Sequence, residues 1–341
     1  MSGAPTLVVI DYPADDRVAA LRIGGMSVLE RTLREAARDG ATRAIVRADA
    51  RHLPALPALA LTVDVVAPGS AVPAEAAPLA GNRVAGVEVT DPASARAAMR
   101  ALLQTCRRPY DGVGDRYVIR YLSLPLTRVL TRTAITPNHV TLANIAIGLA
   151  ACWFARRGER LGFALAGALI FLQVVLDSCD GELARIRHLH SRTGMILDNV
   201  SDDVIDNLFV GALGFGLGGA WAWLGAGAAL GRGLVAAMVY VELAVRGKGG
   251  DVMAFRWWFD SDDDTPAERF NARVTPMTVV RAFGRRDLYC LVFGATCMVG
   301  LPAVGCGLGV AISTASFAMG SVHVVMRLRQ HRARRAAAAR G

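Results

Sequence analysis

The chain has 341 residues, of which 53% are hydrophobic and 20% are charged, and its formal net charge is +9. Soluble domains are about 45–50% apolar and about 25% charged, so this composition excludes a disordered chain or a small disulfide scaffold and favours a membrane protein. In a membrane protein, an excess of arginine is typical of cytoplasmic flanks, so no nucleic-acid partner is expected. The six cysteines lack metal-site spacing and are expected to be buried thiols.

Residues 1–105 are predicted to form a small α/β domain in the cytosol. Runs typical of strands cover residues 7–10, 43–47, 63–67 and 87–90. Helical periodicity covers residues 27–38, and Asp91 followed by Pro92 begins a second helix that extends to about residue 104. Strands that alternate with helices in this way are typical of an α/β layer.

Residues 106–136 are predicted to be a juxtamembrane segment. Within residues 111–133, apolar side chains alternate loosely with arginines. An amphipathic, arginine-rich segment just before a long apolar stretch is typical of a chain that lies along the membrane surface. A solvated linker helix is the alternative.

Six apolar stretches follow within residues 137–328, each close to the roughly 20 residues that span a bilayer. They cover residues 138–157, 160–184, 194–218, 222–246, 287–303 and 304–327. Arginines are concentrated in residues 185–192, in residues 246–286 and in the basic tail at 329–341, and the positive-inside rule then places both termini in the cytoplasm. The loop that contains Arg156 and Arg157 opposes this orientation. The predicted architecture is an α-helical integral membrane domain with six transmembrane helices, preceded by the small α/β cytosolic domain.

Four aspartates lie where the second apolar stretch ends and the third begins. Asp177 and Asp180 are at i and i+3, and Asp198 and Asp202 are at i and i+4, so each pair lies on one helix face. A carboxylate in or near hydrocarbon is unfavourable unless it is paired, hydrated or bound to a metal. Four converging carboxylates without a His or Cys set favour two hard divalent cations, Mg²⁺ or Mn²⁺.

Two alternatives remain open for these aspartates. They could form a proton or ion pathway, as in an ion- or proton-coupled membrane carrier. They could instead be paired with the nearby arginines Arg185, Arg187 and Arg192. A carrier would leave the small residues that accompany the aspartates, such as Gly181 and Ala184, without an explanation.

The spacing of these residues resembles the signature of the CDP-alcohol phosphotransferase (CDP-alcohol phosphatidyltransferase) family. The matching residues are Asp177, Asp180, Gly181, Ala184, Arg185, Gly194, Asp198 and Asp202. The resemblance extends over residues 108–327 through the motifs Asp111-Gly112, Thr136-Pro137-Asn138-x-Val140-Thr141 and Gly284-Arg285-Arg286-Asp287. These outer motifs look most like the inositol-phosphate-using branch that makes di-inositol phosphate phosphate, where a nucleotidyltransferase-like domain precedes the membrane domain.

The resemblance implies that an acceptor hydroxyl attacks the β-phosphorus of a CDP-alcohol and that CMP leaves. It implies metal ligands at Asp177, Asp180 and Asp198, and a further ligand or the general base at Asp202. The donor would be of the CDP-diacylglycerol or CDP-inositol type, in phospholipid or inositol-phosphodiester synthesis. Besides the donor, an acceptor alcohol such as an inositol phosphate, membrane lipids and a second copy of the chain are the implied partners.

The resemblance also implies contacts to the CDP group from Asn138, Thr141, Asp177, Gly181, Ala184, Arg185 and Gly194. Helix capping would explain Asn138 and Thr141 as well, and a positive-inside anchor would explain Arg185. A phosphate on the acceptor would bind Lys248, Arg285 and Arg286, for which anchoring at the membrane surface is the alternative.

Residues 1–105 depart from the nucleotidyltransferase pattern. Residues 24–31, GGMSVLER, resemble the stretch that follows the catalytic loop. Residues 11–23, DYPADDRVAALRI, contain no glycine to cradle a triphosphate and no lysine to neutralise it. We therefore expect a degenerate domain without catalytic activity, which leaves a role for a separate cytidylyltransferase as a partner.

Overall fold

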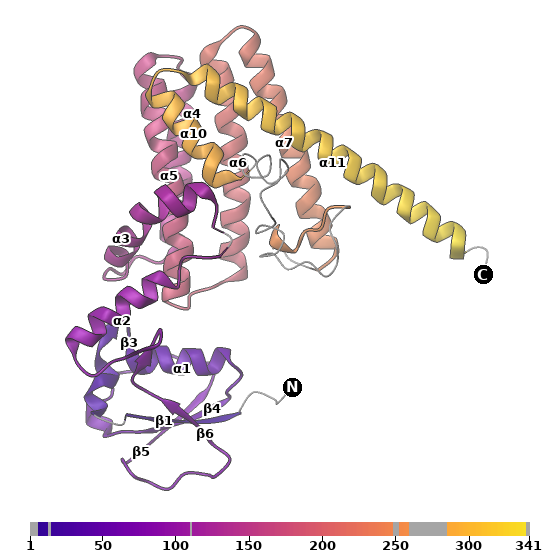
Figure 1. The fold of residues 1–341 in the computed structure, drawn as a ribbon. Coiled ribbons are helices and arrows are strands. Elements are labelled where there is room, and N and C mark those ends of the chain that lie inside the picture. Colours follow the sequence, from indigo (N-terminus) through magenta and orange to yellow (C-terminus); the bar gives the residue numbers. More distant parts are fainter. Residues whose placement is uncertain (1–5, 13–14, 110, 248–251, 259–284, 339–341) are drawn as a thin grey trace. The chain divides into compact units, whose positions relative to one another are not determined.

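The computed structural model describes residues 6–12, 15–109, 111–247, 252–258 and 285–338 (Figure 1). The chain divides into two compact units. The first unit comprises residues 1–107, 126–135 and 182–189, and the second comprises residues 108–125, 136–181 and 190–341.

The first unit contains a four-stranded sheet in the order β5-β4-β1-β6, and all its neighbouring strands are parallel. The strands are β1 (Leu7–Asp11), β4 (Arg43–Arg47), β5 (Thr62–Val66) and β6 (Ala77–Ala80). Two short hairpins join β2 (Arg22–Ile23) to β3 (Met26–Ser27) and β7 (Arg83–Val84) to β8 (Val87–Glu88). The strands predicted at 7–10, 43–47 and 63–67 and the expected small α/β layer are therefore confirmed. The strand predicted at 87–90 covers only two residues of a hairpin, and β2, β3, β6 and β7 were not predicted.

Two helices complete the α/β layer, and both begin at caps that the sequence encodes. In α1 (Val28–Arg38), the Ser27 hydroxyl accepts a hydrogen bond from the Glu30 backbone N–H at 3.1 Å. In α2 (Pro92–Gln104), Asp91 is the N-cap and Pro92 occupies the first turn. The apolar face of α1 packs on the sheet in a core that includes Leu29, Leu33, Ile10 and Val46.

The second unit is helical. Its helices are α4 (Pro137–Arg156), most of α5 (Arg160–Ile186), α6 (Arg192–Leu217), α7 (Ala220–Val245), α10 (Arg286–Met298) and α11 (Pro302–Ala338). A short helical turn at Asp115–Ile119 leads into α3 (Arg120–Leu130), so the amphipathic segment predicted at 111–133 is largely helical. Figure 1 shows α4 and α6 as neighbours, and α6 also packs against α7.

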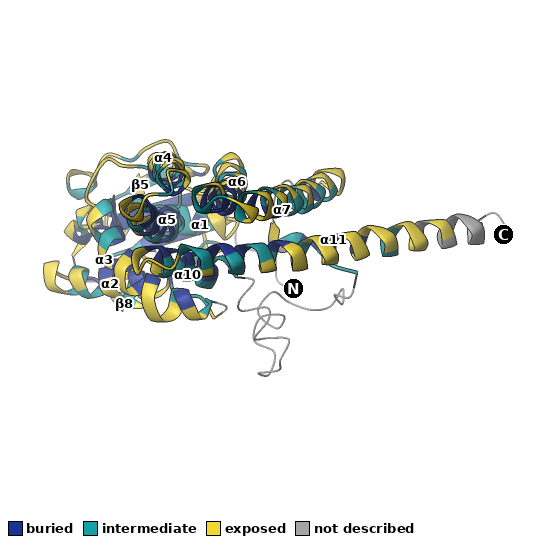
Figure 2. Cartoon of the chain, turned by 90° about the horizontal axis from the view of Figure 1, so that it is seen from above, coloured by how far each residue is buried: buried dark blue, intermediate teal, exposed yellow. Residues whose placement is uncertain are grey.

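Four helices among the described residues are long and apolar enough to cross a membrane. They are α4, α5, α7 and residues Pro302–Gln330 of α11. Large apolar side chains on α7 are exposed, such as Trp223, Leu230 and Val245, as expected where lipid replaces water. Figure 2 shows that much of the C-terminal half of α11 is exposed as well.

Buried aromatic and small residues hold the helical unit together. The rings of Phe209 and Phe293 lie 6.0 Å apart between centroids. At Gly214 a side chain would meet the Trp221 carbonyl oxygen at 2.4 Å, so glycine allows α6 and α7 to approach closely. No disulfide joins the six cysteines, all of which lie in the described part of the chain, and five of them are buried, as predicted.

Candidate metal and substrate site

The aspartates predicted to act together do converge in the structure. Asp177 and Asp180 lie near the end of α5, and Asp198 lies in the first half of α6. One carboxylate oxygen from each of the three lies within 4.8 Å of the others. The fold therefore brings two helix faces together at one carboxylate cluster, as the spacing predicts.

An arginine from a third helix meets this cluster. The Nη1 atom of Arg286, at the start of α10, lies 2.8 Å from Asp177 Oδ2 and 2.8 Å from Asp202 Oδ2. Its Nε atom donates to Asp206 Oδ2 at 3.1 Å. From the sequence, Arg286 was predicted at the acceptor phosphate. Three other arginines, and not Arg286, were the predicted alternative partners of the aspartates. One of those three, Arg187, donates instead to backbone carbonyls of residues 130, 133 and 135.

Several polar atoms at the cluster are buried and have no hydrogen-bond partner among the described residues. They include the Oδ1 atoms of Asp177, Asp198 and Asp202, and Nη2 of Arg286. Buried carboxylate oxygens without a partner are unfavourable, and a hard divalent cation satisfies such oxygens. The donor set contains only oxygen, so it fits Mg²⁺ or Mn²⁺ rather than a metal that prefers sulfur or imidazole.

A second layer of side chains supports Arg286 through Asp206. The Tyr289 hydroxyl donates to Asp206 Oδ2 at 2.5 Å, and Arg232 Nη2 donates to the Tyr289 hydroxyl at 2.5 Å. The guanidinium carbon of Arg232 also lies 4.7 Å from the centre of the Tyr289 ring. Neither Arg232 nor Tyr289 was predicted. An arginine in the middle of an apolar stretch was nevertheless a signal, because charged residues at such positions have partners.

The residues predicted around the CDP group lie at the start of α4 and on the helices that bear the aspartates. Thr136, not Asn138 or Thr141, is the N-cap of α4. Thr141 donates from its hydroxyl to Asp180 Oδ2 at 2.9 Å, so it contacts the carboxylate cluster directly. A side chain at Gly194 would lie 3.1 Å from Asn138 Oδ1, so these two residues are neighbours.

The other residues predicted at the CDP group or at the acceptor phosphate lie on α5, lie just before α10, or are outside the described residues. Gly181 is half-buried and follows Asp180 directly in α5, and Ala184 and Arg185 occupy the next turn. Arg285 donates from Nε to Asp287 Oδ1 at 2.9 Å. Lys248 lies outside the described residues.

Two of the three outer motifs, Asp111-Gly112 and Gly284-Arg285-Arg286-Asp287, are far apart in the sequence but meet in the helical unit. The Asp115 backbone N–H donates to Asp287 Oδ2 at 3.2 Å. A side chain at Gly112 would overlap the Asp287 carboxylate, with only 2.1 Å to Oδ2, so a larger residue here would displace the Asp287 side chain. Burial, together with the neighbouring Asp287 carboxylate, raises the pKa of Asp115 to about 6.

Comparisons with known proteins agree with this site. Residues 134–301 match the family model described as CDP-alcohol phosphatidyltransferase. A bifunctional IPC transferase and DIPP synthase of Thermococcus kodakarensis is 30% identical over 134 residues, which are 38% of this chain and 29% of the relative. Its counterpart from Aquifex aeolicus is 28% identical over 141 residues, 40% of this chain and 31% of the relative.

A third relative, the inner membrane protein YnjF of Escherichia coli, is 37% identical over 106 residues, 30% of this chain and 47% of the relative. The chain spans less than a third of the length of the two bifunctional relatives that it matches. Their names agree with the branch that the outer motifs resemble. The matched segment contains all eight signature residues and every aspartate of the cluster, and residues 134–301 are thereby a domain of the CDP-alcohol phosphatidyltransferase family.

Proposed function

We propose that the chain is a divalent-metal-dependent CDP-alcohol phosphotransferase of the membrane. It would move a substituted phosphate group from a CDP-alcohol to an acceptor hydroxyl and release CMP. The observation that carries this proposal is the meeting of three carboxylate oxygens within 4.8 Å, at the positions of the family signature, with buried Oδ1 atoms that have no hydrogen-bond partner among the described residues.

Asp177, Asp180 and Asp198 are the residues proposed to hold Mg²⁺ or Mn²⁺, and the family resemblance implies two ions with Asp202 as a further ligand. Bound cations of this kind neutralise a pyrophosphate and its leaving group. Thr141 supports the arrangement because its hydrogen bond to Asp180 Oδ2 orients that carboxylate.

Asp202 is the residue proposed as general base. Its Oδ2 is held by Arg286 Nη1 at 2.8 Å, while its Oδ1 has no hydrogen-bond partner among the described residues. An oriented carboxylate with one oxygen available can take the proton of the acceptor hydroxyl while the hydroxyl oxygen forms its bond to phosphorus. The bond from phosphorus to the CMP oxygen breaks in the same displacement, and CMP carries away the electron pair.

The proposed acceptor contact is Arg286. Its Nη2 is buried without a partner among the described residues, although the rest of the guanidinium binds three carboxylates. An unused guanidinium N–H beside the proposed base suits an acceptor that carries phosphate, such as an inositol phosphate. Arg285 and Lys248 would add to this region, and Asn138, Gly181, Ala184, Arg185 and Gly194 would contact the CDP group. The donor would be a CDP-inositol or a CDP-diacylglycerol.

For the membrane domain, residues 137–328, we propose six transmembrane helices with both termini in the cytoplasm. Four are the candidate spans, and α6 and α10 would be the other two. α6 has too many charges for an ordinary span, but its Asp206 is bound by Arg286 and its Asp203 accepts a hydrogen bond from Tyr240 at 2.8 Å. Paired carboxylates of this kind are tolerated inside a helical bundle.

For residues 1–105 we propose a degenerate nucleotidyltransferase-like domain, followed by the juxtamembrane segment 106–136, and for residues 329–341 a basic cytosolic tail. In the loop where a triphosphate would bind, Asp16 accepts a hydrogen bond from the Asp49 backbone N–H at 2.7 Å and lies 2.5 Å from His52 Nδ1. This acid therefore supports the domain's own loops. A separate cytidylyltransferase would then supply the CDP-alcohol, and family resemblance favours a homodimer.

The test is CMP release by the full chain in nanodiscs, with CDP-diacylglycerol or CDP-inositol as donor and inositol phosphate or another polyol as acceptor. We expect release that requires Mg²⁺ or Mn²⁺ and that falls on the order of a hundredfold in Asp198→Asn. Asp203→Asn is the matched control, because Asn can still accept the Tyr240 hydrogen bond, and its rate should stay within about threefold. Absence of CMP release from every donor would overturn the proposal, and accompanying ion flux in proteoliposomes would favour the carrier.

A further inference from the structure

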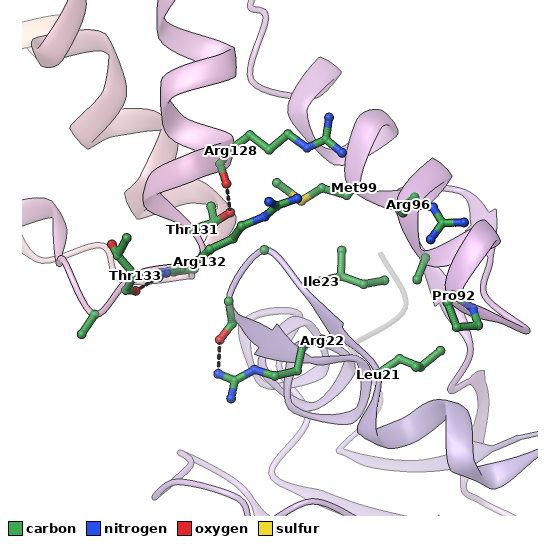
Figure 3. Close-up of a pocket in the computed structure, with 15 residues that line it drawn as sticks. Leu21, Arg22, Ile23, Pro92, Arg96, Met99, Arg128, Thr131, Arg132 and Thr133 are labelled. Carbon is green, nitrogen blue, oxygen red and sulfur yellow. Dashed lines mark hydrogen bonds between the residues drawn. The ribbon is translucent and has the colours of Figure 1, made fainter.

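The first unit contains a pocket of about 760 Å³ that is lined by several arginines and by none of the cluster aspartates (Figure 3). The β2–β3 hairpin and α2 form part of its wall, and residues 128–134 with Arg187 form the rest. All of these residues belong to the same compact unit. A pocket of this volume is large enough to hold a small molecule.

The charges around this pocket all have the same sign. Five of its fifteen lining residues are arginines, namely Arg22, Arg96, Arg128, Arg132 and Arg187, and no Asp or Glu is among the fifteen. Figure 3 shows three of them, Arg96, Arg128 and Arg132, reaching the same opening from different parts of the unit. Asp91, whose charge interacts with Arg96, does not line the pocket. The pocket is therefore a concentration of positive charge that an anion would neutralise.

Backbone contacts hold one arginine in place without neutralising it. Arg187 donates to the carbonyl oxygens of Thr133 at 2.6 Å and Ile135 at 2.7 Å, and these oxygens carry no net charge. Its Nε is buried and has no hydrogen-bond partner among the described residues. Burial and the nearby charge of Arg22 lower the pKa of Arg187. Two uncompensated guanidinium groups thus repel one another at this wall.

The hairpin turn lets the backbone approach the arginine wall closely. Gly24 and Gly25 have φ angles of +64° and +89°, a backbone conformation that residues other than glycine rarely adopt. A side chain at Gly25 would lie 2.7 Å from the Thr131 carbonyl oxygen and 2.8 Å from Arg187 Nε. Most of the remaining wall is apolar, with Leu21 and Met99 among its residues, while Thr131 and Thr133 add hydroxyl groups. Such a lining suits a ligand with a charged head and an uncharged remainder.

We propose that this pocket binds a phosphate ester, with the phosphate held by the arginines Arg96, Arg128 and Arg132 and the uncharged part lying on the apolar wall. Planar guanidinium groups bind phosphate oxygens in a bidentate geometry, and a phosphate monoester carries close to two negative charges at neutral pH, which suits several arginines better than the single charge of a carboxylate. The phosphate belongs either to a soluble phosphate ester or to the headgroup of an acidic membrane lipid. The two sources share the same chemistry at the arginines, and the experiment separates them.

Binding is measured on the full chain in metal-depleted buffer, where the uncompensated carboxylates of the aspartate cluster repel an added phosphate. Glycerol 3-phosphate is titrated calorimetrically as the soluble probe. Phosphatidic acid in phosphatidylcholine nanodiscs, read by native mass spectrometry, is the lipid probe. We expect one of the two probes to bind, and the one that binds identifies the source of the phosphate.

The test variant is Arg96→Gln combined with Arg128→Gln, and we expect it to weaken binding of that probe at least about tenfold. The matched control is Arg83→Gln combined with Arg100→Gln, which removes the same charge from exposed positions of the same unit that do not line the pocket. The control should bind within about twofold of the unchanged chain.

A further variant keeps the test informative if the double variant does not fold. Arg132 is exposed, so Arg132→Gln should fold normally and still weaken binding several-fold. Failure of both probes to bind the unchanged chain would overturn the proposal. Equal weakening by the pocket variant and by its control would overturn it too, because a general effect of surface charge would then suffice.

Discussion

Replacing Arg286 with alanine removes the cation that binds three carboxylates of the site. The change deletes contacts of 2.8 Å to Asp177, 2.8 Å to Asp202 and 3.1 Å to Asp206, whose side chains are 24%, 14% and 1% exposed. Removing one partner of a buried ion pair costs about 3–5 kcal/mol. Asp206 keeps its hydrogen bond from Tyr289, and Asp177 is partly exposed to solvent. We therefore expect the lower value, a loss of about 3 kcal/mol in the free energy of unfolding without metal.

Added Mg²⁺ should restore much of this loss, because the freed carboxylates can then bind the ion. A ligand at a hundred times its dissociation constant stabilises the folded state by about 2.7 kcal/mol, nearly the size of the loss. Unfolding midpoints in detergent, with and without Mg²⁺, measure both the stability lost on substitution and the stability gained from the ion. The variant should gain more from Mg²⁺ than the unchanged chain does, since Arg286 no longer competes with the ion for Asp177 and Asp202.

Arg285→Ala is the control for this experiment. Arg285 is the preceding residue, and its Nε binds Asp287 at 2.9 Å, which is not one of the cluster aspartates. The loss of the Arg285 side chain should lower the unfolding midpoint without changing how much Mg²⁺ raises it. If Arg286→Ala unfolds at the midpoint of the unchanged chain in metal-depleted buffer, and gains no more from Mg²⁺, the proposed neutralisation by this arginine is refuted.

Two further predictions concern the place where the outer motifs meet. Gly112→Ala puts a methyl group against Asp287 Oδ2, at 2.1 Å before relaxation, and should cost about 1–3 kcal/mol, whereas Gly227→Ala in open space on α7 should not destabilise; unfolding midpoints compare the two. The raised pKa of Asp115, about 6, means that its stability contribution is fully present below about pH 4 and is lost as the pH rises through 6. Relative to Asp115→Asn, the unchanged chain should lose about 2–3 kcal/mol between pH 4 and pH 7, and parallel pH profiles of the two proteins would contradict this.

The aspartate cluster was predictable because its information is local. Three or four residues along a helix return a side chain to the same face, so Asp177 and Asp180 must be neighbours wherever α5 lies. Asp198 and Asp202 follow from the same geometry on α6. Their convergence rests on the packing of two consecutive helices, which an apolar pattern and a short connection already favour.

Strand β6 of the α/β layer, in contrast, could not be predicted from local sequence. Its residues, Ala77 to Ala80, include Pro78 and no β-branched side chain, so no local strand pattern exists. The strand forms because it pairs in parallel with β1, and its place at the edge of the sheet leaves room for a proline. Tertiary pairing, which is not a local property of the sequence, therefore decides the conformation here.

Arg232 lies between these two cases. An arginine in the middle of the apolar stretch 222–246 must have a partner, and this much follows from the sequence. The identity of the partner depends on how α6, α7 and α10 pack. The partner is the Tyr289 hydroxyl, which accepts a hydrogen bond from Arg232 and donates one to Asp206. Because Asp206 also binds Arg286, this buried carboxylate is linked to two arginines, directly to Arg286 and through the Tyr289 hydroxyl to Arg232. The charge in α7 therefore contributes to the site through the orientation of Asp206, although Arg232 contacts none of the signature aspartates among the described contacts.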